Sequence, residues 1–365
     1  MYINPYAVLR HDGGWQSDGV LMSFLHDQRD GLISVRQLAR AAVRRPRVPA
    51  HIRERYLPLT SERRQCIEQS LRDNFFADGG GRTRPAEVYL QTPEGREDFQ
   101  DHVSGRLAQF RTWIVPWLDS LFRLDGARVL EIGCGTGASS VALAEQGAEV
   151  VGVDISAAAL ATARDRCAAY GLHPAFVETS ATRISSAFAG KTFDAILFFA
   201  VLEHLTWEER IVSLRAAWEL IPAGKIIAVI EAPNRLWYVD IHTTDEPFYH
   251  WLPDEAAIAY TRYTHGPSHH LWKGPAGEAT LELARLGRGV SYHEFVIAWD
   301  IAPSQLPVVG HAAEFHENRM LSSAIAPLST ARRYRRFLAR VAPDLHPAFL
   351  QPSLDVAFRK AGVAR

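Results

Sequence analysis

The sequence predicts an α/β fold, namely a doubly wound, mostly parallel seven-stranded sheet preceded by a helical N-terminal region. Three observations lead to this prediction. From Ala127 onward, short apolar runs alternate with segments of helical periodicity. The strand-like runs are apolar throughout, as expected for parallel strands covered by helices on both faces. The first run ends in a loop with glycine at alternate positions, Gly133, Gly135 and Gly137.

The N-terminal region, residues 1–125, is helical and separate in character. Apolar residues recur at helical spacing in residues 31–45, 62–76 and 98–121. Pro116 should kink the last of these helices or start a new turn, because proline lacks the N–H that a helix interior needs. We expect this region to be a cap over the main domain or an arm that forms a homodimer.

The second domain, residues 126–365, carries the sheet. Helices are expected between its first five strands, and two long insertions, 231–289 and 301–350, follow strands five and six. The expected helices span 138–147, 157–171 and 208–220. The expected strands span 127–133, 148–155, 174–179, 193–200, 224–233, 290–299 and 352–361.

Composition excludes several classes of protein. The 365 residues include 40 Lys and Arg against 41 Asp and Glu, so the whole molecule is not a polyanion binder. Cys66, Cys134 and Cys167 lack metal-binding spacing and indicate a reducing compartment. The N-terminus has no apolar signal segment, and the longest apolar run, residues 195–202, is too short to span a bilayer. We therefore expect a cytoplasmic protein without a membrane span.

Two carboxylates beside the glycine loop predict the ligand. The glycines alone would also suit a dinucleotide, whose pyrophosphate binds at such loops. However, Glu131 stands two residues before Gly133, where it would repel a pyrophosphate and attract an ammonium group. Asp154 ends the second strand, 21 residues after Gly133, and can accept both hydroxyls of a ribose. A ligand with an amino-acid end and a nucleoside end satisfies both features.

Four motifs carry a resemblance to a known family. VLEIGCGTG (129–137) and VVGVDIS (150–156) resemble the first two motifs of class I S-adenosylmethionine-dependent methyltransferases. FDAILFFAVLEHL (193–205) and AWELIPAGKIIAVIEAPNR (217–235) resemble the motifs around that family's fourth and fifth strands. The chain looks most like the small-molecule O-methyltransferases of ubiquinone biosynthesis. The resemblance implies a Rossmann-like methyltransferase fold and S-adenosyl-L-methionine as cofactor.

The resemblance also implies which residues contact the cofactor. Glu131, with the backbone at Gly133 and Gly135, would hold the methionine part, and Asp154 would hold the ribose. Arg106, in an upstream helix, would meet the cofactor carboxylate, with Arg111 as its competitor. The resemblance implies further cofactor contacts from the loop and around the adenine and the sulfonium. The residues are Gly137, Ile155, Ser180, Ala181, Phe199 and Ala200.

Methyl transfer to a hydroxyl usually needs a base with a pKa near neutrality. His242 and His204 are the candidates, with Glu231 as a further carboxylate at the end of the fifth strand. The insertion 231–289 is rich in histidine and aromatic residues and begins beside the cofactor, so we expect it to form a pocket wall or lid over the acceptor. Its candidate substrate-binding residues are Trp237, Tyr238, Asp240, His250 and Trp251.

A metal ion is not expected. Certain ubiquinone-type relatives bind a divalent cation with acidic and histidine residues around the fourth-strand motif. Glu203 and His204 match part of that cluster. Ala200 stands where a further glutamate would be expected, so one ligand is missing.

The expected function is methyl transfer to a small-molecule acceptor, above all to a hydroxyl of a natural product, saccharide or lipid intermediate. One alternative is a nucleic-acid methyltransferase, because residues 36–64 hold nine arginines and only two acids. We favour a solvated helical face for that stretch, since no aromatic residues interleave the arginines and a nucleic-acid partner is therefore not expected. The other alternative is a non-catalytic protein that retains the cofactor fold.

Overall fold

The computed structural model describes residues 48–79, 85–264, 267–317 and 330–362. At its centre lies a seven-stranded sheet with the strand order β3-β2-β1-β4-β5-β7-β6. Neighbouring strands from β3 to β5 are parallel, and β7 is antiparallel to both of its neighbours. The predicted fold class is confirmed. The strands are β1 (Arg128–Ile132), β2 (Glu149–Asp154), β3 (Ala175–Glu178), β4 (Ala195–Phe199), β5 (Ile226–Pro233), β6 (Val308–His311) and β7 (Ser353–Arg359).

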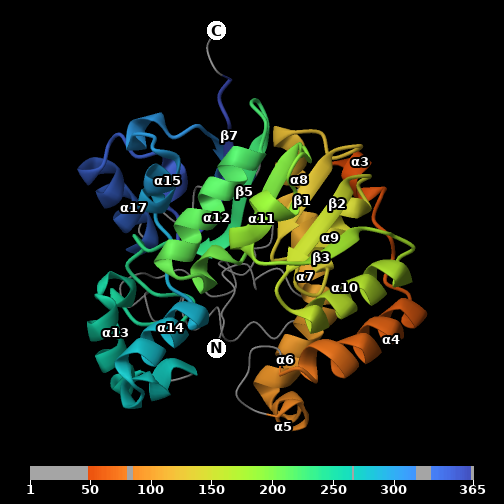
Figure 1. Cartoon of the computed structure of the whole chain (residues 1–365), viewed down its shortest axis with the longest axis horizontal. Coiled ribbons are helices and arrows are strands. Elements are labelled where there is room, and N and C mark those ends of the chain that lie inside the picture. Colours follow the sequence, from red (N-terminus) through yellow and green to blue (C-terminus); the bar gives the residue numbers. More distant parts are fainter. Residues whose placement is uncertain (1–47, 80–84, 265–266, 318–329, 363–365) are drawn as a thin grey trace, which may run out of the picture.

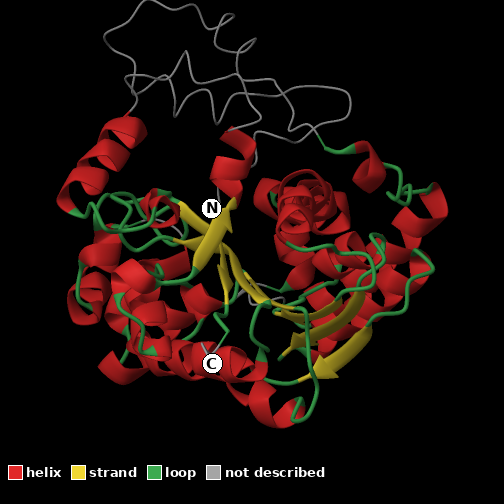
Figure 2. Ribbon diagram, turned by 90° about the horizontal axis from the view of Figure 1, so that it is seen from above, coloured by secondary structure: helices red, strands yellow, loops and turns green. Residues whose placement is uncertain are grey.

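Helices cover both faces of the twisted sheet (Figures 1 and 2). Successive strand residues point to opposite faces, so Val129 and Leu130 enter two different apolar cores. One core packs under the N-terminal helices and α9 (Ala138–Ala144), with α10 (Ala157–Ala169) at its edge. The other core packs under α12 (Trp207–Leu220), α15 (Tyr292–Trp299) and the short α11 (Ile184–Ala187).

Six of the seven expected strands are present, and the prediction of a strand over 290–299 is wrong. That segment forms α15, whose start is fixed by a capping box between Ser291 and Glu294. Phe295, Ala298 and Trp299 then lie at helical spacing on its buried side. The sixth strand is β6, which falls inside the segment predicted as the second insertion.

The N-terminal region is helical, as predicted. The expected helix over 62–76 is present as α4 (Ser61–Ser70) and a π turn, η2 (Leu71–Phe76), while the one over 31–45 lies outside the described residues. The third expected helix is longer than predicted and runs unbroken from residue 93 to residue 121. It consists of α6 (Pro93–Gln100), η3 (Asp101–Gly105), α7 (Arg106–Gln109), η4 (Phe110–Ile114) and α8 (Val115–Leu121).

This long helix contains two π turns, η3 and η4. The prediction that Pro116 begins a new turn is confirmed, since Pro116 lies in the first turn of α8 directly after η4. Because proline has no N–H to donate to the preceding turn, the Arg111 carbonyl there accepts a hydrogen bond from the Tyr56 hydroxyl instead. We call the described helices before β1 the cap; besides those named above it includes α3 (Ala50–Arg53) and α5 (Ala86–Gln91).

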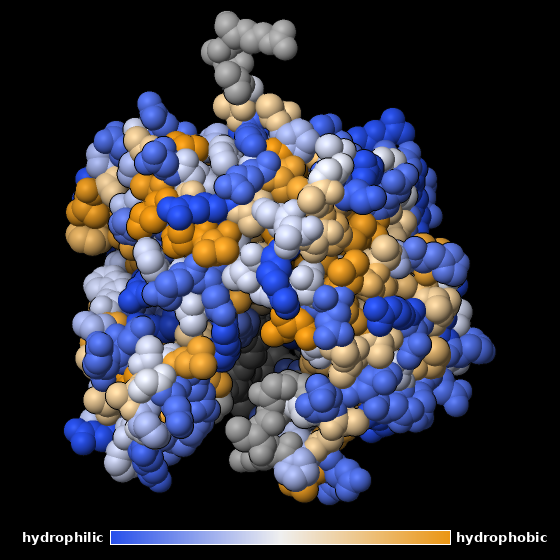
Figure 3. Space-filling model, viewed as in Figure 1, coloured by the Kyte–Doolittle hydropathy of each residue, from blue (hydrophilic) through white to orange (hydrophobic). Residues whose placement is uncertain are grey.

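The segment after β5 forms a lobe of its own. It holds α13 (Asp254–Tyr260) and α14 (Ala276–Leu286) around a small apolar core centred on Tyr249 and Leu283. In Figure 1 this lobe and the α5–α6 end of the cap stand on opposite sides below the sheet, and Figure 3 shows the surface hollowed between them.

The remaining helices are α16 (Ala312–Glu317) and α17 (Thr330–Val341). Among the described residues, no helix combines the length and apolar composition that crossing a bilayer requires.

A buried arginine joins the cap to the sheet domain. Arg166 of α10 is 0% exposed and donates to three main-chain carbonyls, at 2.7 Å to Thr136, 2.6 Å to His102 and 3.1 Å to Val103. Thr136 belongs to the glycine loop, and the other two belong to η3. Burial lowers the pKa of Arg166 to about 10, so the guanidinium is still charged at neutral pH. One side chain therefore fixes the distance between the loop and the cap.

We expect Arg166→Met to lower the free energy of unfolding by about 3 kcal/mol, because buried carbonyls lose their donor. Urea denaturation followed by circular dichroism measures the change. Arg164→Met is the matched control on the same helix, since Arg164 is exposed and its bond to the Phe176 carbonyl is long, at 3.3 Å. That variant should stay within about 0.5 kcal/mol of wild type. Equal destabilisation by both substitutions would contradict a specific role for Arg166.

Candidate functional site

The glycine loop leaves β1 at the carboxyl edge of the sheet, next to the point where strand order reverses between β1 and β4. Gly133, Gly135 and Gly137 all have positive φ, at 78°, 49° and 79°. A Cβ on Gly133 would lie 1.9 Å from a methyl carbon of Val201, so the loop packs tightly against the end of β4. A Cβ on Gly135 would meet nothing within 4 Å. Gly135 thus combines a glycine conformation with open space, as a bound ligand would require.

Asp154 holds this loop in place. One carboxylate oxygen accepts the Gly135 amide at 2.9 Å, and the other accepts the Ser156 amide at 2.9 Å. The same residue lines a cavity of about 360 Å³ at the carboxyl edge of the sheet. Burial raises the pKa of Asp154, and the backbone hydrogen bonds partly offset that shift. The carboxylate is therefore both anchored to the loop and available at the cavity wall.

Glu131 does not have the position that we expected from the sequence. Its side chain is 0% exposed and is not among the described residues that line the cavity. The carboxylate instead accepts hydrogen bonds from the hydroxyls of Ser139 and, at 2.6 Å, Ser140. Burial raises the pKa of Glu131 to about 7. Glu131 thus stands behind the wall, in contact with Ser139, which lines the cavity, and its contact with the methionine part of the cofactor stays a prediction.

The cap forms the opposite wall of the cavity. Phe75, Asp98, His102, Arg106 and Phe110 all line it. Of the two arginines considered from the sequence, Arg106 is thus at the cavity. Its guanidinium lies 3.4 Å from the Asp101 carboxylate.

Arg111 is used elsewhere. It forms a two-point ion pair with Glu145 of α9, at 2.7 and 2.5 Å, and donates to the Leu57 carbonyl. It is not among the described residues of the cavity wall.

Four cap residues of the wall, Phe75, Asp98, His102 and Phe110, were missed by the sequence analysis, although a signal exists for the last three. Asp98, His102, Arg106 and Phe110 follow one another at intervals of four residues. An α-helix alone would let this series drift around its axis, but η3 and η4 add residues per turn and keep it on one face. His102 also reaches the glycine loop, with Nδ1 3.2 Å from the Thr136 hydroxyl.

The other predicted cofactor residues divide into two groups. Phe199 and Ala200, at the end of β4, line the cavity, and Ala200 has a positive φ of 47°. Ile155, Ser180 and Ala181 are not among the described lining residues. Ile155 is 74% exposed, although it directly follows Asp154. Ser180 caps η5 (Ala181–Arg183) by accepting the Thr182 amide at 3.2 Å, and Ala181 is buried.

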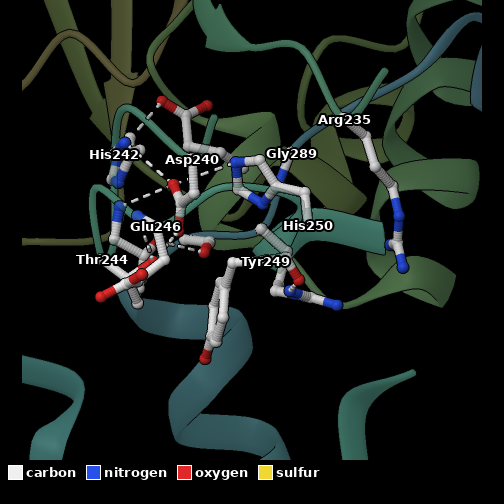
Figure 4. Close-up of polar contacts among 12 residues, drawn as sticks. Arg235, Asp240, His242, Thr244, Glu246, Tyr249, His250 and Gly289 are labelled. Atoms are coloured by element: carbon white, nitrogen blue, oxygen red, sulfur yellow. Dashed lines mark hydrogen bonds and ion pairs between the residues drawn. The ribbon is translucent and has the colours of Figure 1, made fainter. Parts of the chain in front are cut away.

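The five predicted substrate residues do not line the cavity within the described part of the chain. Asp240 and His250 are 0% and 1% exposed and lie in a closed polar network (Figure 4). The Asp240 carboxylate accepts the amides of His242 and Thr243, and lies 3.0 Å from His250 Nε2. Burial alone would raise the pKa of Asp240, but His250 and these amides bring it below its usual range. These two residues hold the lobe together, and their contact with a substrate stays a prediction.

The three aromatic residues of that prediction also pack against protein. Trp237 and Tyr238 contact Tyr334 of α17, with ring centres 5.4 and 4.9 Å apart. Trp251 is half exposed, contacts Phe248, and donates its indole N–H to the Arg235 carbonyl at 3.0 Å. Within the described part of the insertion 231–289, the cavity lining includes Glu231 alone, at the end of β5, so the expected pocket wall or lid stays a prediction.

Two of the three candidate catalytic residues lie on the cavity wall. Glu231 has a positive φ of 62° at an irregularity of β5, where its amide donates to Asp355 at 2.8 Å. Its carboxylate accepts a hydrogen bond from Gln109 of the cap. His204 follows β4, and its Nδ1 lies 2.8 Å from the Arg285 carbonyl. This contact fixes Nδ1 as the protonated nitrogen and leaves a lone pair on Nε2.

His242, the third candidate, lies behind the wall. Its side chain is 9% exposed, and its Nε2 is 3.9 Å from Glu203, which is fully buried. Burial lowers the pKa of His242 to about 3. Glu203, His204 and His242 each offer one ligand atom within 4.8 Å of the others, so they can hold a metal ion.

Comparison with known proteins identifies the part of the chain that carries the glycine loop. Residues 129–224, from β1 to the turn before β5, match the family model described as a methyltransferase domain. The ubiquinone biosynthesis O-methyltransferase of Pseudomonas aeruginosa is 34% identical over 113 residues, which are 31% of this chain and 47% of that protein. The enzyme of the same name from Ruegeria pomeroyi is 35% identical over 129 residues, 35% of this chain and 50% of that protein. The chain thus spans about half the length of these curated relatives.

Solved structures are similar to parts of the chain. The magnesium protoporphyrin IX methyltransferase of Synechocystis, with bound S-adenosylmethionine, has a TM-score of 0.34 and 26% identity, covering 46% of this chain and 77% of its own. An S-adenosylmethionine-dependent methyltransferase from Clostridium acetobutylicum has a TM-score of 0.33 and 17% identity, covering 44% and 60%. The matched range, residues 129–224, contains the glycine loop, Asp154 and the end of β4. The order of the strands in the sheet agrees with the predicted fold. The chain therefore contains a class I methyltransferase domain whose methyl donor is S-adenosylmethionine.

Proposed function

We propose that this protein is an O-methyltransferase that transfers the methyl group of S-adenosylmethionine to a hydroxyl of a small-molecule acceptor. One observation carries the proposal. A single cavity joins Gly135 and Asp154, on the cofactor side, to His204 and Glu231, which can receive a proton. The relatives named as ubiquinone biosynthesis O-methyltransferases support a small-molecule acceptor.

The described residues fit the cofactor. Asp154 would accept the ribose hydroxyls, and the open face of Gly135 would admit the ligand against the loop. The amides of Gly133 and Gly135 already donate to Val153 and Asp154, so the loop would meet the ammonium group through its carbonyls. Arg106 would meet the carboxylate across the cavity.

The adenine would lie beyond Asp154, next to Ile155, Ser180 and Ala181, which are not among the described residues of the cavity wall. Ile155 offers an exposed apolar side chain for ring packing, and the backbone at Ser180 and Ala181 follows the neighbouring strand β3. Glu131 would contribute by orienting Ser139 from behind the loop.

The bound cofactor would supply an electrophilic methyl group on a sulfonium. The protein has to orient the acceptor oxygen, exclude water and take up the proton of the hydroxyl. Phe110 and Phe199 pack edge to face, with centres 5.2 Å apart, and form an apolar part of the wall beside Glu231 and His204. Glu231 is held by Gln109, so its carboxylate has a defined orientation before any acceptor binds.

The nucleic-acid alternative gains no support from the described arginines. Arg55 pairs with Asp125 and bonds to the Gln146 carbonyl, and Arg63 donates to the carbonyls of Pro58 and Ala169. Arg64 pairs with Glu68 one helical turn away. These three side chains are used within the fold, Arg53 is exposed at the end of α3, and the other arginines of the stretch, within residues 36–47, lie outside the described residues.

We expect Asp154→Ala to weaken binding of S-adenosylhomocysteine by about 10- to 100-fold, through loss of charged hydrogen bonds to the ribose and to the loop. Isothermal titration calorimetry measures the dissociation constant. Glu149→Ala is the control, because Glu149 is exposed at the opposite end of the same strand. Glu131→Gln should have a smaller effect than Asp154→Ala, since Glu131 acts through Ser139. Unchanged affinity in Asp154→Ala would remove this residue from the cofactor site.

We expect Glu231→Gln to lower turnover by about 100-fold if Glu231 receives the proton. Glutamine keeps the shape and the acceptor for Gln109, so the substitution changes little besides basicity. Formation of S-adenosylhomocysteine is measured against a panel of phenols, catechols, sugars and polyprenyl alcohols, with RNA and DNA as comparison substrates. Glu219→Gln, on the exposed side of α12, is the control. Full turnover in Glu231→Gln would exclude this role, and methylation of nucleic acid alone would overturn the proposed acceptor class.

A further inference from the structure

Glu203 is a buried carboxylate without the hydrogen bonds that such a group normally has. Its side chain is 0% exposed, and among the described residues neither oxygen accepts a hydrogen bond. An ionised carboxylate in that state is costly unless a cation compensates it. Arg210 is a cation that acts on Glu203, but its guanidinium binds Glu294 and the main-chain carbonyls of Glu203, Arg288 and Gly289 and not the Glu203 carboxylate.

Two imidazoles face this carboxylate. Nε2 of His204 and Nε2 of His242 each lie 3.9 Å from the same oxygen, Oε1 of Glu203. The bond from His204 Nδ1 to the Arg285 carbonyl is the outer contact that commonly orients a metal-bound histidine and makes it a better ligand. The two rings are 5.1 Å apart and tilted, so both lone pairs can converge on one point.

The fold brings these groups together from two distant segments. Glu203 and His204 follow β4, while His242 comes from the lobe after β5. The lobe is fixed to β4 at this point, because the Arg288 amide donates to the Glu203 carbonyl at 2.9 Å. The backbone of His242 is held by Asp240, at 2.9 Å. A Cβ on Gly287 would lie 2.7 Å from the His242 ring, so glycine is needed there to let the ring reach Glu203.

We propose that Glu203, His204 and His242 bind a divalent transition-metal ion. Two imidazole nitrogens and one carboxylate oxygen suit Zn²⁺, Fe²⁺, Co²⁺ or Mn²⁺ better than Mg²⁺ or Ca²⁺, which prefer oxygen ligands. Tetrahedral coordination with bonds of about 2.1 Å places ligand atoms roughly 3.4 Å apart. The present separations of up to 4.8 Å therefore close by small side-chain rotations.

The site opens toward the cavity. His204 lines the cavity beside Ala200, Val201 and Glu231, whereas His242 and Glu203 stand behind it. Three protein ligands with one side open is the arrangement of a catalytic rather than a structural metal site. The role of the metal ion rests on the proposed function. The ion would hold the acceptor oxygen and make its proton more acidic. Because His204 would be a metal ligand, Glu231 would receive that proton.

Direct binding of Co²⁺ to the full chain, first treated with a chelator and then desalted, tests the site without cofactor or acceptor. We expect one equivalent to bind and to give the visible absorption bands of low-symmetry Co²⁺, and Zn²⁺ to displace it. Mg²⁺ in tenfold excess should not displace it. His242→Ala and Glu203→Gln should each weaken binding by at least tenfold, with folding checked by circular dichroism. His270→Ala is the control, because His270 is an exposed histidine of the same lobe, paired with Glu282 at 2.7 Å.

Absence of a stoichiometric Co²⁺ site, or equal binding by His242→Ala and wild type, would overturn the proposal. If Glu203→Gln does not fold, His242→Gln tests the loss of a metal ligand instead. This substitution changes the side-chain volume less than His242→Ala does. The two proposals can fail separately. Co²⁺ binding without methyl transfer to any small molecule would count against the proposed function and leave the metal site standing. Methyl transfer at full rate after complete metal removal would refute the metal's role and leave the proposed function standing.

Discussion

The cavity at the carboxyl edge of the sheet depends on one buried guanidinium. Arg166 binds the carbonyl of Thr136, in the glycine loop, and the carbonyls of His102 and Val103, in the cap. The two walls of the cavity come from segments far apart in the chain, and this side chain joins them together with the bonds from His102 to Thr136 and from Gln109 to Glu231. A charge without a carboxylate partner is a costly way to join two elements, but the directions of its N–H groups make it specific.

The sequence was sufficient to predict the sheet, the loop and Asp154, because these features depend on residues close together in the chain. Continuous apolar strands and a glycine-rich strand-to-helix turn predict the same local structure whatever the rest of the chain does. The error at residues 290–299 had a local cause as well. Aromatic and β-branched residues there favour a strand, whereas the capping box of Ser291 and Glu294 favours a helix, and the helix forms.

The site residues were harder to predict because they depend on which segments meet. Asp240 and His250 look like candidates for chemistry, yet they pair with one another inside the lobe, at 3.0 Å. Conversely, the missing glutamate at Ala200 argued against a metal, and nothing near Ala200 in the sequence points to His242. Only the docking of the lobe on β4 brings His242 to Glu203. The sequence does not distinguish a buried polar residue that will find a partner from one that will lack a hydrogen bond. That difference arises only when the chain folds.

The π turns of the cap make this wall sensitive to chain length. Asp98, His102, Arg106 and Phe110 share the cavity face because η3 and η4 each contain more residues than an α turn. Removing a single residue from η3 would convert it toward an ordinary turn and rotate everything after it by about 100°. Arg106 and Phe110 would then swing out of the cavity although neither had been changed. In this segment, single-residue deletions should be tolerated far less well than substitutions, whereas surface loops commonly accept changes of length.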